Sequence, residues 1–267
     1  MYNFNYHKPK TIEQAVELMN SCEDPKIISG GHTLIPTLKQ RLAQPSDIVD
    51  ISNINGISDI SLESIDSRIN IGSLSSHYKV SNSDIVIQNI PSLAYLASQI
   101  GDPQVRYRGT IGGSVANADP SADYPAALVS LNSTVVTNNG KYKAEDFFVD
   151  MFETSLSDDE IITNILFDIP IKSAYVKFRN PASGYAMVGV FVAKYHSSVI
   201  VSVTGAGPKV FRMSEAEELL TKSFDAKSLN ELRIESNGLN SDIHASSEYR
   251  AHLIKTSLQD AVRIALK

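Results

Sequence analysis

The stretch QVRYRGTIGGSVANADPSADYPAAL occupies residues 104–128 and contains three glycines and two hydroxyl side chains between Arg108 and Ser114. Glycine lets the backbone approach a ligand closely, and serine and threonine hydroxyls can donate hydrogen bonds to phosphate oxygens. The segment has neither the GxGxxG spacing of a dinucleotide-binding fingerprint nor the GK[ST] ending of a P-loop. It therefore predicts a loop suited to a phosphate group, outside both of those nucleotide-binding classes.

A second glycine segment, Ser29-Gly30-Gly31-His32-Thr33, lies upstream. It follows a predicted strand at 26–29 and precedes a helix-like run at 34–42 and a second strand at 47–52. The N-terminus of a helix presents unpaired N–H groups to an anion, so the segment predicts a pyrophosphate site. Glycine pairs are also common in ordinary turns, and His32 could be a simple surface residue. A purely structural role for this segment therefore stays open.

The rest of the chain reads as short elements of both types. A capping box predicts a helix that begins at Thr11, with Gln14 three residues later, and ends near Cys22. Further patterns predict strands and helices at 69–73, 91–100, 133–143, 160–170, 175–179, 187–195, 198–204 and 246–266. Strands followed by helices predict an α+β protein, and Pro170 favours a domain boundary nearby.

Composition excludes several classes of protein. The formal net charge is −6 and no cluster of basic residues appears, which argues against nucleic acid as a partner. No stretch approaches the roughly 18 apolar residues of a membrane span, and the N-terminus lacks the apolar core of a signal peptide. We therefore expect a cytoplasmic protein of two domains, with any phosphate bound mainly by backbone amides.

The cysteine and histidine content predicts no metal in this chain. Cys22 is the only cysteine, so the chain cannot supply the several thiolates that an iron–sulfur cluster normally requires. The six histidines show no HExxH or comparable ligand spacing. We expect Cys22 to be a buried core residue.

Three segments, GGHTLIPTLKQRL (30–42), GDPQVRYRGTIGGSVANADPSADYPAAL (101–128) and EIIT (160–163), resemble one known family. They are similar to the medium, FAD-binding chain of carbon monoxide dehydrogenase and of related xanthine dehydrogenase-type molybdenum hydroxylases. The resemblance runs over most of the chain. It implies an α+β fold in which an FAD-binding domain of the PCMH/CO dehydrogenase flavoprotein type spans 1–170, with subdomains at about 1–55 and 56–170. A small domain of antiparallel sheet plus helices then spans 171–267.

The resemblance also implies which residues contact FAD. The residues expected around the pyrophosphate are Ser29, Gly30, Gly31, His32, Thr33, Thr110, Ile111, Gly112, Gly113 and Ser114. The residues expected elsewhere on the cofactor are Ile100, Gly101, Asp123, Ile162, Lys177 and Tyr185. Related chains often read GDYA where this chain has Ser183-Gly184-Tyr185-Ala186. The tyrosine would lie against the isoalloxazine ring, although an ordinary tyrosine at the start of a strand is the alternative. The effect of the missing acid stays open.

The function implied by the resemblance is that of an electron outlet. A flavin accepts electrons singly and releases them in pairs, which suits a junction between one-electron clusters and a two-electron acceptor. FAD is expected to be noncovalent, and the molybdenum cofactor and [2Fe–2S] clusters are expected in a large and a small partner chain. The expected assembly is a dimer of heterotrimers that reduces an external acceptor. No residue of this chain need be catalytic as a general acid or base.

Two other functions remain as alternatives. One is a stand-alone FAD-dependent oxidoreductase of the same broad fold, similar to the reductase that makes UDP-N-acetylmuramate, although no substrate acid or base is evident. The other is a structural subunit that has lost its flavin, which the two intact glycine segments disfavour. The 4-hydroxybenzoyl-CoA reductase branch carries an extra cluster in its flavin chain, and a single cysteine excludes that version. The resemblance implies that the molybdenum chain chooses the substrate, so carbon monoxide, aldehydes, purines and other heterocycles stay open.

Overall fold

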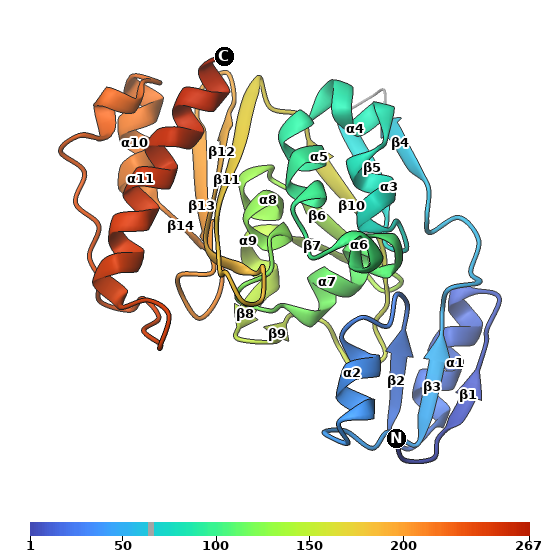
Figure 1. The fold of residues 1–267 in the computed structure, drawn as a ribbon. Coiled ribbons are helices and arrows are strands. Elements are labelled where there is room, and N and C mark those ends of the chain that lie inside the picture. Colours follow the sequence, from blue (N-terminus) through green and yellow to red (C-terminus); the bar gives the residue numbers. More distant parts are fainter. Residues whose placement is uncertain (64–66) are drawn as a thin grey trace.

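The computed structural model describes residues 1–63 and 67–267. In the described residues, three larger sheets accompanied by helices follow one another along the chain, and a fourth sheet is a two-stranded hairpin (Figure 1). Helices and strands are mixed, and the predicted α+β class is confirmed. The first sheet and its helices lie at one end of the molecule and the third sheet at the other, with the second between them.

The first sheet is small and parallel, in the order β1-β3-β2. It is built from β1 (Asn5–His7), α1 (Ile12–Ser21), β2 (Pro25–Ile28), α2 (Leu34–Lys39) and β3 (Asp47–Asp50). The predicted cap of α1 is confirmed, because the Thr11 hydroxyl accepts a hydrogen bond from the Gln14 amide at 3.3 Å. The helix ends at Ser21 with Cys22 as its cap. Cys22 is half-buried and lies outside the apolar core of this sheet, so the expectation of a core cysteine was wrong.

The second sheet is antiparallel, in the order β4-β5-β10-β6-β7. Its strands are β4 (Ile60–Glu63), β5 (Arg68–Gly72), β6 (Thr134–Thr137), β7 (Lys141–Lys143) and β10 (Ile162–Asp168). The hairpin predicted at 133–143 is confirmed as β6 paired with β7. The apolar core against this sheet includes the fully buried Ile69, Ile71 and Ile165.

Short helices and one small hairpin connect these strands. They are α3 (His77–Ser81), α4 (Asp84–Asn89), α5 (Pro91–Ser98), α6 (Pro103–Arg108), α7 (Ile111–Asn117), α8 (Tyr124–Ser130), α9 (Ala144–Phe147), β8 (Phe148–Asp150) and β9 (Glu153–Thr154). The prediction of a loop from Arg108 to Ser114 was wrong in part, because α7 begins inside it. The reason is local, since the Thr110 side chain caps the helix by accepting from the Gly113 amide at 3.1 Å.

The third sheet is antiparallel, in the order β11-β12-β13-β14. This part of the chain comprises β11 (Lys172–Arg179), β12 (Ala186–Lys194), β13 (Val199–Thr204), β14 (Phe211–Arg212), α10 (Ser214–Lys222), a short 3-10 helix (Ala226–Leu229) and α11 (Ser247–Leu266). Tyr175 and Phe191 of this sheet pack into the core of the second sheet. The opposite face packs against α10 and α11 (Figure 1). We propose the boundary between the domains near residue 170, because β10 ends at Asp168 and β11 begins at Lys172.

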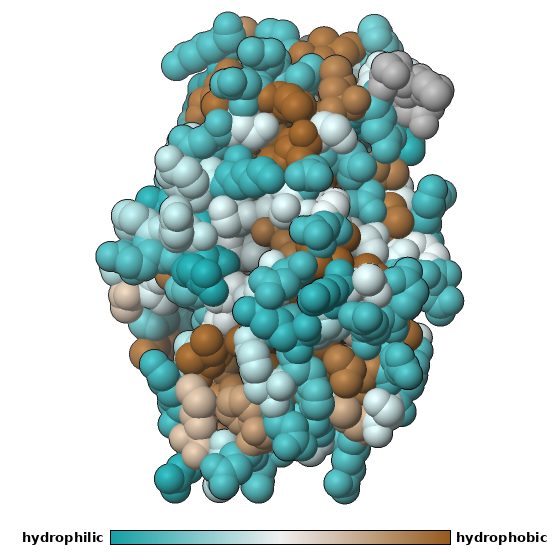
Figure 2. All heavy atoms as spheres, turned by 90° about the vertical axis from the view of Figure 1, so that its right-hand side faces the viewer, coloured by the Kyte–Doolittle hydropathy of each residue, from teal (hydrophilic) through white to brown (hydrophobic). Residues whose placement is uncertain are grey.

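Figure 2 views the molecule from the side of the first two sheets and shows a mainly hydrophilic surface with separate apolar patches. Within residues 1–63 and 67–267, no helix combines the length and the apolar character that a membrane crossing requires.

Candidate cofactor site

A cleft of about 850 Å³ lies between the first glycine segment, the start of α7 and the β11–β12 connection. Its volume is in the range of pockets that hold small molecules and cofactors. The structure brings together these predicted site residues along its walls: Ser29, Gly30, Gly31, His32, Thr33, Ile100, Gly101, Thr110, Gly112, Gly113, Ser114, Asp123, Ile162, Lys177 and Tyr185. Ile111 does not line the cleft, because its side chain is fully buried in the apolar core.

The two glycine segments are in direct contact at the wall of the cleft. A Cβ atom on Gly30 would overlap the carbonyl oxygen of Arg108 and would lie 2.9 Å from the Cα atom of Gly109. The hydroxyl oxygens of Ser29 and Thr110 are 3.0 Å apart and form a hydrogen bond between the two segments. Gly30 is therefore required by a close backbone approach between the two segments.

The backbone N–H groups of the two segments differ in their availability. In the described part of the chain, no acceptor pairs with the N–H groups of Gly31, His32 or Thr33. The N–H groups at the start of α7 all have partners within the protein. Those of Ile111 and Gly112 donate to the carbonyl oxygens of Ser75 and Ser73. Those of Gly113 and Ser114 donate to the hydroxyl and the carbonyl oxygen of Thr110. Unpaired N–H groups suited to an anion thus lie in the first segment, while the second contributes close approach and hydroxyl groups.

Ser73 is a cleft residue that the sequence reasoning missed. Its hydroxyl is buried and has no hydrogen-bond partner among the described residues. A Cβ atom on Gly112 would lie 2.5 Å from the Ser73 Cβ atom, so glycine is needed at 112 for this contact. A buried polar group without a partner is uncommon, and here it borders the cleft. A serine at the end of a strand carries no local signal that could have identified it.

A buried ion pair forms part of the cleft wall. The Lys177 ammonium lies 2.9 Å from the Asp123 carboxylate, with exposed side-chain fractions of 3% and 4%. The Tyr175 hydroxyl donates to the same carboxylate, and Lys177 also donates to the carbonyl oxygen of Gln99 at 3.3 Å. Burial raises the pKa of Asp123, and the nearby Lys177 opposes that effect. The pair links α8 and β11 to the end of α5.

His77 is a second missed residue of the cleft wall. Its ring is buried, and burial lowers the pKa of His77 to about 4, so the ring is neutral at pH 7. The Nδ1 atom lies 3.3 Å from the Tyr124 hydroxyl oxygen. A Cβ atom on Gly109 would come within 2.6 Å of the Nε2 atom, so Gly109 lets the second segment pack over this ring.

Tyr185 occupies the turn between β11 and β12. Gly184 has a φ of +73°, and the Asn180 amide donates to the Tyr185 carbonyl oxygen at 2.9 Å. Tyr185 is 48% exposed and also lines the cleft. Burial, followed by the nearby Asp119 carboxylate, raises the pKa of its hydroxyl. The phenol is therefore un-ionised at neutral pH and lies where the cleft meets solvent.

The residues present fit a bulky diphosphate cofactor. The unpaired N–H groups of the first segment provide donors for phosphate oxygens, and glycines at 30 and 113 keep that wall free of side chains. Ile28, Ile100 and Ile162 add apolar surface, as expected for the ring systems of a nucleotide cofactor.

Comparison with known proteins agrees with this assignment. Residues 2–170 match the family described as the FAD-binding domain in molybdopterin dehydrogenase. The chain belongs to this family, and it is thus an FAD-binding subunit of an oxidoreductase of the molybdenum hydroxylase type.

Relatives of similar length include the medium subunit of nicotine 6-hydroxylase from Paenarthrobacter nicotinovorans. It is 34% identical, and the match covers 96% of this chain and 95% of that one. The medium chain of glyceraldehyde dehydrogenase from Sulfolobus acidocaldarius is 30% identical, with 97% of each chain covered. In the structure of reconstituted CO dehydrogenase from Oligotropha carboxidovorans, one chain superposes with a TM-score of 0.90 at 29% identity, covering 98% of this chain and 97% of that one.

Proposed function

We propose that this chain binds one FAD noncovalently in the cleft and passes electrons from partner [2Fe–2S] clusters to an external acceptor. The observation that carries the proposal is the convergence of both glycine segments on one cleft in which the first segment has unpaired N–H groups. FAD supplies the chemistry of taking up electrons singly and giving them up in pairs. The relatives are named as medium subunits or chains, which supports a role within a larger enzyme.

The residues of the cleft have distinct roles in this proposal. The segment from Ser29 to Thr33 binds the pyrophosphate through its N–H groups, with the side chains of Thr110 and Ser114 opposite. Ile100 and Ile162 provide apolar contacts, and Gly101 lets the chain turn beside the cofactor with a φ of +49°. The buried pair of Asp123 and Lys177 keeps two walls of the cleft in place.

Tyr185 covers the isoalloxazine ring in this proposal and limits its contact with water. Its place at the solvent side of the cleft supports that role. His32 is exposed, and its Nδ1 atom lies 3.1 Å from the Gly30 carbonyl oxygen. That contact holds the ring within its own segment and favours a cofactor without a covalent bond to this histidine.

The proposed partners are a large chain with the molybdenum cofactor and a small chain with two [2Fe–2S] clusters, assembled as a dimer of heterotrimers in the cytoplasm. The relatives that are named as medium subunits or medium chains favour an electron outlet over a stand-alone flavoenzyme.

The test compares the FAD-loaded chain alone with the chain plus its two partner chains. We expect the single chain not to oxidise carbon monoxide, aldehydes, purines or other heterocycles, because the proposal assigns the molybdenum site to the large partner chain. Adding the molybdenum and [2Fe–2S] chains should allow substrate to bleach the flavin absorbance and should restore turnover. Omitting only the [2Fe–2S] chain should block both. Substrate oxidation by the single chain at a rate similar to that of the complex would contradict the outlet role.

A further inference from the structure

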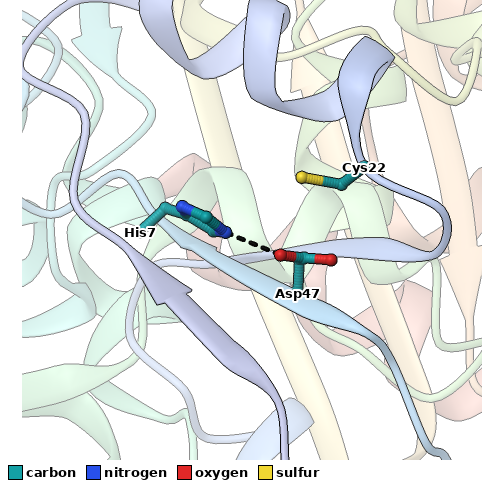
Figure 3. A group of neighbouring side chains, drawn as sticks. All are labelled: His7, Cys22 and Asp47. Atoms are coloured by element: carbon teal, nitrogen blue, oxygen red, sulfur yellow. Dashed lines mark hydrogen bonds and ion pairs between the residues drawn. The ribbon is translucent and has the colours of Figure 1, made fainter.

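Three side chains of the metal-ligand type converge on the first sheet, away from the cleft. They are His7 at the end of β1, Cys22 at the end of α1 and Asp47 at the start of β3 (Figure 3). Their ligand atoms all lie within 4.8 Å of one another. None of the three lines the proposed cofactor cleft. Consecutive members of the group are 15 and 25 residues apart, so no short metal-binding motif in the sequence indicates it.

The fold explains why these residues meet. The strands β1 and β3 are parallel neighbours, with Asn5 opposite Asp47 and His7 opposite Val49. Side chains two residues apart on a strand share a face, so His7 and Asp47 project from the same face of the sheet. The chain leaves α1 at Cys22 beside that face, and Figure 3 shows the sulfur directed toward the carboxylate.

From this geometry, we propose that His7, Cys22 and Asp47 bind one divalent metal ion of the zinc class. An imidazole nitrogen, a thiolate sulfur and a carboxylate oxygen are all established zinc ligands, with bond lengths of about 2.0–2.3 Å. Three protein ligands leave a fourth position for water. The proposal is independent of the flavin function, and it revises the expectation from sequence that this chain holds no metal.

The protons and charges of the site balance on binding. The Asp47 carboxylate accepts from the Ser46 hydroxyl and from His7 at 2.6 Å each, so the Nε2 atom of His7 carries a proton without metal. On binding, Cys22 loses its thiol proton to solvent, and the proton of His7 moves from Nε2 to Nδ1 through exchange with water. One thiolate and one carboxylate then neutralise the two positive charges of the ion.

The site is accessible without unfolding. His7 and Asp47 have exposed side-chain fractions of 30% and 8%, and Cys22 is half-buried. A shallow groove lined by His7, Gln14 and Ser21 opens to solvent beside the group. In a tetrahedral site the nitrogen and oxygen ligands stand about 3.3 Å apart, so the pair now at 2.6 Å must separate by less than an ångström.

The test is a Co²⁺ titration of the full FAD-loaded chain without a histidine tag, followed by competition with Zn²⁺. We expect one Co²⁺ per chain, a thiolate-to-cobalt charge-transfer absorption, and displacement by Zn²⁺. The variants Cys22→Ser and Asp47→Asn should bind at least about tenfold more weakly, and Cys22→Ser should lose the charge-transfer band. The matched control is His244→Gln, because His244 is an exposed histidine in the C-terminal part of the chain.

The metal affinities are compared only between variants whose metal-free forms unfold at the same temperature as the unmodified chain. Circular dichroism measures that temperature. His7→Gln serves as a second variant, so that the result does not depend on Cys22 alone. Absence of a thiolate band in the unmodified chain, or equal affinity in Cys22→Ser and the unmodified chain, would overturn the proposal. The three side chains would then form only a hydrogen-bonded cluster.

Discussion

Replacing Gly113 by valine is expected to remove stoichiometric FAD from a chain that still folds. A Cβ atom at this position would lie 3.0 Å from both the Ser29 and the Thr110 hydroxyl oxygens, and the methyl groups of valine would extend beyond it. The substitution therefore separates the two glycine segments at the hydrogen bond that joins them. We expect the dissociation constant to rise at least roughly a hundredfold, equivalent to about 2.7 kcal/mol. Flavin fluorescence titration measures this change.

Gly140→Val provides the matched control, because a Cβ atom at Gly140 would meet nothing within 4 Å. This variant should bind FAD like the unmodified chain. Gly112 is a poorer test, since a side chain there would press on the backbone of Ser73 and would disturb the fold itself. Stoichiometric FAD in a folded Gly113→Val protein would show that the cofactor does not lie against this wall.

Replacing Lys177 by methionine should cost about 3–5 kcal/mol of unfolding free energy, because it leaves the buried Asp123 carboxylate without its counter-charge. Only the Tyr175 hydroxyl would then remain as a polar partner of that carboxylate among the described residues. The Lys177 side chain is 3% exposed, so water cannot replace its interaction with the carboxylate. Chemical denaturation of the FAD-free chain, followed by circular dichroism, measures the loss.

Two further variants make this result specific. Lys141→Met removes an exposed lysine from β7 and should change the unfolding free energy by no more than about 0.5 kcal/mol. Adding Asp123→Asn to Lys177→Met removes the unpaired charge, and we expect it to recover part of the lost stability. If Lys177→Met and Lys141→Met were equally stable, the buried pair would not have the role assigned to it.

Capping residues and apolar runs predicted helices and strands well where neighbouring residues determine the structure. The cap formed by Thr11 and Gln14 is contained in four consecutive residues, and the helix begins there. The strands of the third sheet have long apolar runs, and β12 is buried along nearly its whole length. Glycine content was misleading at 109–113, because the capping interaction of Thr110 outweighs the low helix propensity of two glycines.

The candidate site was predictable only where a motif or a family resemblance reported it. Ser73 and His77 come from elements that reach the cleft through tertiary packing, so their local sequence says nothing of their neighbours. The resemblance placed Ile111 with the cofactor contacts, yet the helical period of α7 turns its side chain into the core. The group of His7, Cys22 and Asp47 likewise exists only because β1 and β3 pair in parallel.

The most direct test of the account is the flavin content of the chain before and after denaturation. The purified chain, incubated with excess FAD and freed of unbound cofactor, should contain one FAD per chain. Acid or heat precipitation should release all of it into the supernatant, because we propose a noncovalent attachment. A folded chain that retains no FAD would contradict the cofactor site, and yellow colour remaining with the precipitated protein would contradict the noncovalent attachment.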